Sequence, residues 1–234
     1  DVAPSRGLGD VYKRQVLLPR ASYYIEHGMH EKFLSIAKKA IEFVFLIATP
    51  LMVYFILFAK EGVFFLSGLA YSGSIIPMQI IMPTLLFIGL TNIMGIQMLV
   101  PLGKEKIVLY SEIIGAIMDL ILNFILIPKM ASVGAAFGTL VAEMAVWIVQ
   151  IVALRSIVLD AYREIHYKSI LVAILLGIII SGWVKCMSWG NFISLFVSGI
   201  LFFGIYLLAL VVLKEPLICE IKGQVINMII HKKS

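Results

Sequence analysis

Residues 107–154, IVLYSEIIGAIMDLILNFILIPKMASVGAAFGTLVAEMAVWIVQIVAL, determine the fold class of this chain. The stretch predicts two apolar helices, 107–127 and 132–154, which are joined by a hairpin of about five residues. A carboxylate lies inside each helix, Asp119 in the first and Glu143 in the second. A charged carboxylate at mid-bilayer costs at least ~2.5–3.5 kcal/mol, so such residues normally face a bundle interior or a water-filled cavity. The pattern therefore predicts a polytopic membrane protein with a polar interior.

The composition of the whole chain agrees with this interpretation. Of its 234 residues, 61% are hydrophobic and 14% are charged, whereas a soluble domain carries about 45–50% apolar and about 25% charged residues. The apolar residues form blocks long enough to cross the hydrocarbon core, which needs about 20 helical residues. The net charge of +5 comes from basic residues in short loops between these blocks. That arrangement favours a signal for membrane topology over binding to nucleic acid.

The blocks predict an all-α fold, a polytopic transmembrane helical bundle with six full spans. The spans are expected at residues 40–59, 76–101, 107–127, 132–154, 169–187 and 191–213. The predicted organisation is a non-native or disordered N-terminal segment (1–15), a helix end followed by an interfacial amphipathic segment (16–39), a six-helix transmembrane lobe (40–213) and a basic cytoplasmic tail (214–234). The helix end is expected at Pro19 and Arg20, which follow three apolar residues.

Lysine and arginine are distributed unequally between the two sides of the predicted bundle. Thirteen fall on the side of the tail and of the segment before the first span, and three (Lys60, Lys129 and Lys185) fall on the other side. Because positive residues are retained in the cytoplasm, both ends of the chain are expected there. Cys186 and Cys219 then lie on opposite sides of the membrane, so no disulfide bond within the chain is expected.

Polar side chains gather on one face of the helix predicted at 107–127. Glu112, Asp119 and Asn123 are spaced i, i+7, i+11, which places them on one helix face. Asn123 lies four residues past Asp119, so a hydrogen bond between the two side chains is expected. Glu143 lies at a depth similar to that of Asp119, because the two helices run antiparallel. One interpretation is the wall of a cavity, in which burial favours uptake of a proton by Asp119 or Glu143. The other is a buried polar network that only fixes helix packing.

Other motifs carry weaker information. Asn92 and Gln97 lie five residues apart, so at most one of them faces a given cavity. Gly134 and Gly138 form a GxxxG motif, which close helix packing explains. The four histidines make no metal-ligand spacing such as HExxH. No catalytic residue, metal or other cofactor is therefore expected.

Three motifs, taken in order, resemble a known family. They are LPRASYYIEHG (18–28), GIQMLVPLGKEK (95–106) and LNFILIPKMASVGAAFGTLVAE (122–143). Their order and spacing are similar to those of O-antigen flippase-type polysaccharide transporters, which belong to the multidrug/oligosaccharidyl-lipid/polysaccharide exporter superfamily. In the fourteen-helix layout of that family, the six spans correspond to the last six. The resemblance therefore implies the C-terminal half, one lobe of an alternating-access transporter.

The resemblance also implies a function. It is the flipping of polyprenyl-diphosphate-linked oligosaccharides across the bacterial cytoplasmic (inner) membrane for cell-surface polysaccharide biosynthesis, with or without ion coupling. Arg20, Gln97, Asn123 and Glu143 match the family motifs and would line the substrate or ion pathway, whereas Asp119 stands where a neutral polar residue is expected. The implied partners are the lipid-linked oligosaccharide, membrane lipids and the missing N-terminal lobe of the same transporter.

Three alternatives stay open. A multidrug/cation antiporter of the same superfamily would need aromatic-rich cavity walls and an acidic cluster that binds cations. A membrane-embedded polysaccharide biosynthesis enzyme would need catalytic groups, commonly on a sizeable outer loop, and the outer loops predicted here are short and lack histidine. A purely structural subunit would explain the packing motifs but not the mid-membrane acids. A transporter, and not an enzyme, is therefore expected.

Overall fold

The computed structural model describes residues 13–187, 189–220 and 222–223, and within them the fold is all-α without any strand. Five helices are long and apolar enough to cross a membrane, and a bent pair of helical segments makes a sixth candidate. The predicted transmembrane helical bundle is therefore confirmed as the fold class. Most of the predicted segment 1–15, and residues 224–234 of the predicted tail, lie outside the described residues.

The long helices overlap the predicted spans, but the helix at the first span begins at His30 instead of residue 40 and the helix at the fourth span runs to Glu164 instead of ending at residue 154. They are α2 (His30–Leu57), α6 (Glu105–Met130), α7 (Ser132–Glu164), α8 (Tyr167–Gly182) and α9 (Asn191–Val212). A 3-10 turn, η3 (Trp183–Cys186), continues α8. A helix satisfies its backbone hydrogen bonds internally, which is why apolar blocks of this length are helical in a bilayer.

The span predicted at 76–101 is broken into several pieces. They are α4 (Ile75–Ile81), α5 (Thr84–Asn92) and the π-helix η2 (Ile93–Leu99). A 3-10 helix, η1 (Leu69–Ser74), precedes them in the stretch expected to be a loop. The halves before and after the break meet at an angle of 42°. Pro83 lies at the break, and a proline inside a helix removes a backbone hydrogen bond and clashes with the preceding turn.

The N-terminal part is more continuous than expected. α1 (Lys13–Glu26) runs through Pro19 and Arg20, so the helix does not end there as predicted. α2 already begins at His30, so the segment expected to precede the first span belongs to the same helix. Phe33, Ala37 and Ile41 are buried at helical spacing, which explains this continuity. The short helix α3 (Ala59–Ser67) forms where a loop was expected from residue 60 onward.

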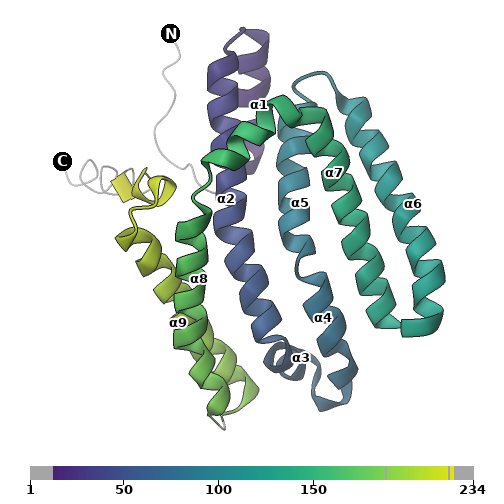
Figure 1. Cartoon of the computed structure of the whole chain (residues 1–234), viewed down its shortest axis with the longest axis vertical. Coiled ribbons are helices and arrows are strands. Elements are labelled where there is room, and N and C mark those ends of the chain that lie inside the picture. The colour runs from purple at the N-terminus through teal and green to yellow at the C-terminus, as the bar shows by residue number, and fades with distance from the viewer. Residues whose placement is uncertain (1–12, 188, 221, 224–234) are drawn as a thin grey trace.

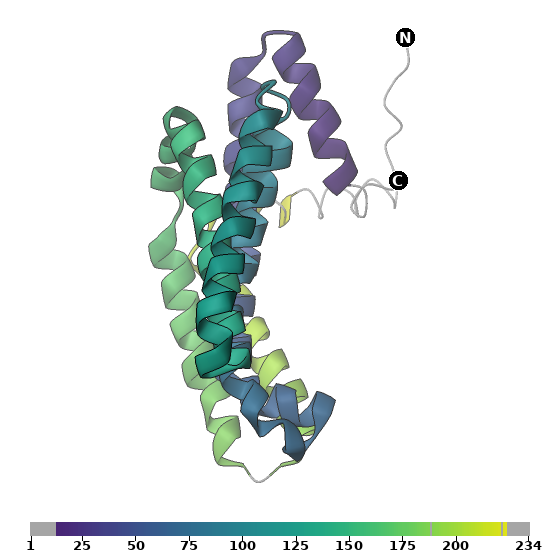
Figure 2. The ribbon, with the colours of Figure 1, turned by 90° about the vertical axis from the view of Figure 1, so that its right-hand side faces the viewer.

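The helices form a thin, curved layer. α8, α2, α5, α7 and α6 stand side by side in Figure 1, and the turned view of Figure 2 shows how shallow this layer is. α2 is central, because it contacts α1, α5, α7, α8 and α9. α6 packs mainly against α7, and α8 against α9. The α6–α7 hairpin therefore forms one edge of the layer.

Aromatic side chains join α2 to α9 in the core. Tyr54 and Phe202 are buried, and their ring centroids lie 5.5 Å apart. The Tyr54 hydroxyl donates a hydrogen bond to the carbonyl of Leu195 at 2.8 Å, and the Tyr206 hydroxyl donates to the carbonyl of Leu46 at 2.8 Å. Both of these tyrosine hydroxyls thus have a partner, as an apolar environment requires.

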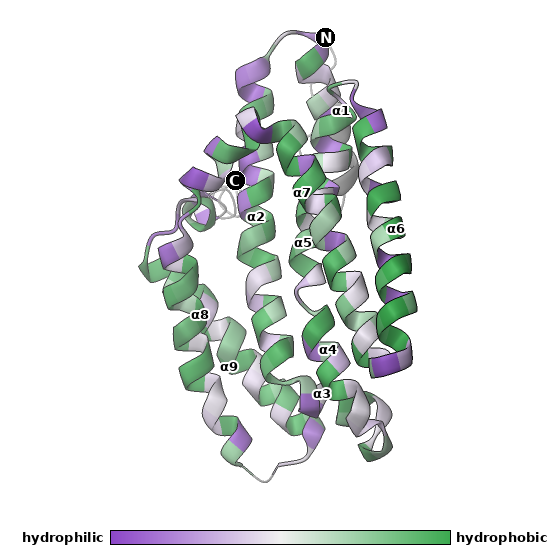
Figure 3. Ribbon diagram, turned by 45° about the vertical axis from the view of Figure 1, so that its right-hand side comes forward, coloured by the Kyte–Doolittle hydropathy of each residue, from purple (hydrophilic) through white to green (hydrophobic). Residues whose placement is uncertain are grey.

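Most residues along the long helices are hydrophobic, and many of the hydrophilic ones lie near the helix ends (Figure 3). On α6, Leu120 is 72% and Phe124 84% exposed, which suits contact with lipid or with another apolar surface. Lys185 donates a hydrogen bond to the carbonyl of Leu57, at the C-terminal end of α2. Lys38 pairs with Glu164 at 2.6 Å near the opposite end of that helix.

Candidate functional site

The α6–α7 hairpin is tighter than predicted. α6 ends at Met130 and α7 begins at Ser132, so Ala131 alone connects them, in place of the expected five or so residues. The turn holds Ala131 at φ 49°, in the left-handed region. α6 extends through Pro128 to its last residues. This short connection keeps the two helices antiparallel and in close contact.

Glycines allow the backbones of α6 and α7 to approach closely. A Cβ atom on Gly115 would lie 2.5 Å from Val146 Cγ2, and one on Gly134 would lie 2.6 Å from backbone atoms of Leu126. Small residues at such interfaces drive helix association in membranes. Gly134 of the GxxxG motif therefore lies in a close helix contact, as the packing explanation predicted.

Three carboxylates converge on one groove between these helices, which we call the acidic groove. Glu112 and Asp119 come from α6, and Glu143 comes from α7. The groove has a volume of about 220 Å³ and is lined by Glu112, Gly115, Ala116, Asp119, Thr139, Ala142, Glu143 and Val146. Asp119 and Glu143 are half-buried and Glu112 is exposed. The predicted common face of α6 and the proximity of Glu143 to Asp119 are both confirmed.

Asp119 is oriented by hydrogen bonds from both helices. Asn123 Nδ2 donates to Asp119 Oδ2 at 3.0 Å, and Thr139 Oγ1 donates to Asp119 Oδ1 at 3.4 Å. Asn123 Oδ1 is buried and accepts no hydrogen bond from any described residue. The sequence predicted the pairing of Asp119 with Asn123, because the two are four residues apart, but it did not single out Thr139.

Basic side chains are absent from the lining of the acidic groove, as far as the described residues go. Among the described residues, no lysine or arginine lies within ion-pairing distance of Glu112, Asp119 or Glu143. A cleft lined by charges of one sign concentrates counter-ions. The groove can therefore attract protons, metal cations or organic cations, and its carboxylates can accept hydrogen bonds from hydroxyl groups.

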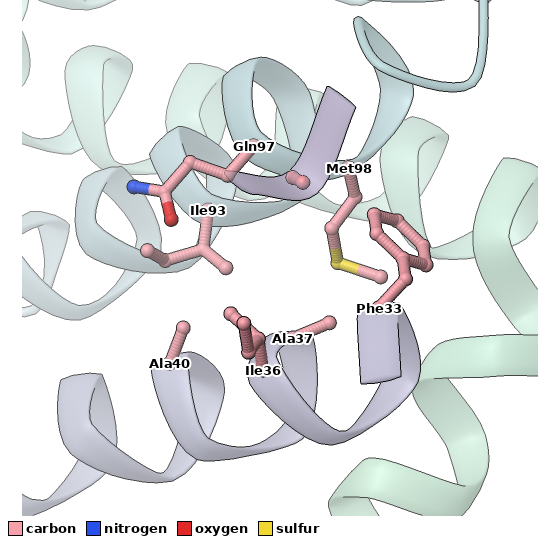
Figure 4. A pocket seen from close by; sticks show the side chains of 8 residues that line it. Phe33, Ile36, Ala37, Ala40, Ile93, Gln97 and Met98 are labelled. Carbon is pink, nitrogen blue, oxygen red and sulfur yellow. The ribbon is translucent and has the colours of Figure 1, made fainter. Parts of the chain in front are cut away.

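Gln97 lies in a different part of the molecule. It belongs to η2 and lines an almost filled space of about 10 Å³ between α1, α2 and η2, with Ala21, Phe33 and Met98 among its neighbours. Figure 4 shows its amide on the side away from Phe33 and Met98. Gln97 is therefore placed in a helix packing interface, and the structure does not bring it into the acidic groove.

Arg20 is also separate from the acidic groove. It is exposed on α1, and the next residue, Ala21, lines the same space as Gln97. The five predicted pathway residues therefore divide into two groups. Asp119, Asn123 and Glu143 meet at the α6–α7 hairpin, whereas Arg20 and Gln97 lie near the α1–η2 contact.

A buried polar pair on the same hairpin was not predicted from the sequence. Gln150 is only 1% exposed, and its Nε2 donates to Ser111 Oγ at 3.1 Å. Its Oε1 is buried and finds no partner among the described residues. Gln150 follows Glu143 by seven residues, a spacing that places both on one face of α7 and could have revealed it.

Comparison with known proteins relates the chain to a membrane protein. No family model and no solved structure matches the chain. The chain is similar to the uncharacterized membrane protein MJ1068 of Methanocaldococcus jannaschii, with 28% identity over 217 residues. These cover 93% of this chain and 42% of that protein, so the chain spans less than half the length of its relative. Together with its long apolar helices, this similarity identifies the chain as a multi-pass membrane protein.

Proposed function

We propose that this chain is one lobe of a transporter that flips polyprenyl-diphosphate-linked oligosaccharides across the cytoplasmic membrane. The observation that carries the proposal is the acidic groove, in which three carboxylates come from two helices that are long and apolar enough to span a membrane. Such residues are costly in a bilayer and mark substrate or ion pathways. The motifs that resemble polysaccharide transporters supply the substrate class.

In the proposed mechanism, the acidic groove faces a hydrated cleft between this lobe and a second one. The carboxylates and Asn123 would accept and donate hydrogen bonds to sugar hydroxyls, while the polyprenyl tail stays in lipid. The second lobe belongs to chain outside these residues, in keeping with a relative of more than twice the length. Rocking of two lobes about a midplane site is the general solution for alternating access.

The test uses the complete two-lobed transporter that contains this chain, reconstituted into liposomes with a fluorescent lipid-linked oligosaccharide. Flipping is measured as the fraction of label that becomes accessible to a membrane-impermeant quencher. Glu143→Gln should slow flipping about tenfold, equivalent to ~1.4 kcal/mol of barrier height. The matched control is Glu105→Gln, an exposed acid in the first turn of α6. Equal rates for wild type and Glu143→Gln at every pH would remove the pathway role of Glu143.

A multidrug/cation antiporter is the second candidate, because the acidic groove lacks any basic partner among the described residues. A cationic drug would meet three carboxylates there, whereas a diphosphate group would be repelled. The same liposomes, loaded with a fluorescent organic cation under a proton gradient, distinguish the two functions. Cation exchange without oligosaccharide flipping would favour the antiporter.

A further inference from the structure

Three side chains that can ligate a metal converge where α2, α8 and the segment after α9 meet. Glu42 comes from α2, His166 precedes the first residue of α8, and Glu215 follows the end of α9. One ligand atom from each side chain lies within 4.8 Å of the other two. His166 Nδ1 itself is 4.0 Å from Glu42 Oε1. This cluster shares no residue with the acidic groove.

Glu215 provides a second, independent observation. It is only 1% exposed, and its Oε2 accepts the backbone N–H of Ile218 at 3.0 Å. No described lysine or arginine lies within ion-pairing distance of it, and the lysines nearby pair with other acids, Lys38 with Glu164 and Lys39 with Glu220. A carboxylate removed from water is normally paired with a cation or bound to a metal.

We propose that Glu42, His166 and Glu215 form a binding site for a divalent transition metal of the Zn²⁺ class. One imidazole and two carboxylates are a donor set that Zn²⁺ accepts. Ligands of a tetrahedral Zn²⁺ lie about 3.4 Å from one another when each is ~2.1 Å from the ion. His166 can close the remaining gap, because its side chain is 53% exposed and makes no capping hydrogen bond.

The bound metal would connect three segments that are distant in sequence. It would join the central helix α2 to the α7–α8 junction and to the chain that leaves α9. The competing explanation is that the carboxyl groups of Glu42 and Glu215 share a proton and bind no metal. The two explanations differ in whether His166 matters, because a shared proton does not need the imidazole.

The experiment titrates the purified, chelator-stripped full chain with Zn²⁺ at neutral pH, by calorimetry and by the shift in melting temperature. Wild type should bind one equivalent and become more heat-stable. His166→Ala and Glu42→Gln should each weaken binding at least about tenfold and lose the thermal shift. The matched control is His30→Ala, an exposed histidine at the start of α2.

His166→Ala keeps the test decisive, because this side chain is largely exposed and its removal leaves no buried gap. Equal Zn²⁺ affinity in wild type and His166→Ala would overturn the proposal. So would the absence of any Zn²⁺-dependent heat or thermal shift in wild type. A melting temperature that depends on pH and on Glu42, but not on Zn²⁺, would identify the shared proton instead.

Discussion

Gly138 is the residue that lets Asn123 reach Asp119. A Cβ atom at position 138 would lie 2.7 Å from Asn123 Oδ1 and 3.5 Å from Asp119 Oδ1. Gly138→Ala should therefore push Asn123 away and break its 3.0 Å hydrogen bond to Asp119. Overpacking of this kind typically costs ~1–3 kcal/mol, so we expect a lower melting temperature in detergent.

The control for this substitution is Gly204→Ala, in the middle of α9. A Cβ atom there would meet no atom within 4 Å, and alanine has the higher helix propensity, so stability should be unchanged or slightly raised. In the double variant Gly138→Ala/Asn123→Ala, the clash is gone and the loss should be smaller than the sum of the two single effects. Strict additivity would show that Gly138 does not act through Asn123.

The α6–α7 hairpin is the element on which the candidate site depends, and its close contacts at Gly134 and Gly115 differ in kind. At Gly134 the neighbour is the backbone of Leu126, which would lie 2.6 Å from an added Cβ atom, whereas at Gly115 it is a methyl group of Val146, at 2.5 Å. A side chain can rotate away and a backbone cannot. Gly134→Ala should therefore lower the melting temperature more than Gly115→Ala does.

Thermal unfolding of the two alanine variants measures this difference, and Val146→Ala supplies the check. Combined with Gly115→Ala, it removes the clashing methyl group, so the pair should be more stable than Gly115→Ala alone. The same change should not rescue Gly134→Ala. If Gly115→Ala lowers the melting temperature more than Gly134→Ala does, the kind of neighbouring atom does not determine the cost of the added methyl group.

At the scale of the whole molecule, the orientation in the membrane can be read from the two native cysteines. Cys186 and Cys219 are both exposed and unpaired thiols, and the unequal distribution of basic residues predicts that Cys219 is cytoplasmic. In single-cysteine variants, a membrane-impermeant maleimide should label Cys186 in intact cells. Cys219 should react only after permeabilisation.

The two variants, Cys219→Ser and Cys186→Ser, control for each other, because each leaves one thiol in the same protein. Labelling of both cysteines in intact cells would contradict the proposed topology. Labelling of Cys219 alone would invert it. Either result would also place the proposed metal site on the outer side of the membrane instead of the cytoplasmic side, because Cys219 lies only four residues beyond Glu215.

The sequence by itself determined the class of protein and the approximate positions of its long helices. Hydropathy and length are properties of one continuous segment, so they do not depend on how the segments pack. It also predicted the partnership of Asp119 with Asn123, since residues four apart share a helix face. It overestimated the length of the α6–α7 connection and ended α1 too early. The low helix propensity of proline is a weak guide to where a helix stops, because tertiary packing can override it.

Only the tertiary structure decided which distant side chains meet. It separated Arg20 and Gln97 from the acidic groove, and it gathered Glu42, His166 and Glu215 from three segments. The spacing of the histidines had excluded a metal motif, but no spacing rule applies to ligands that come from three separate segments. Such encounters depend on how α2, α8 and α9 pack, and packing is a property of all the helices together.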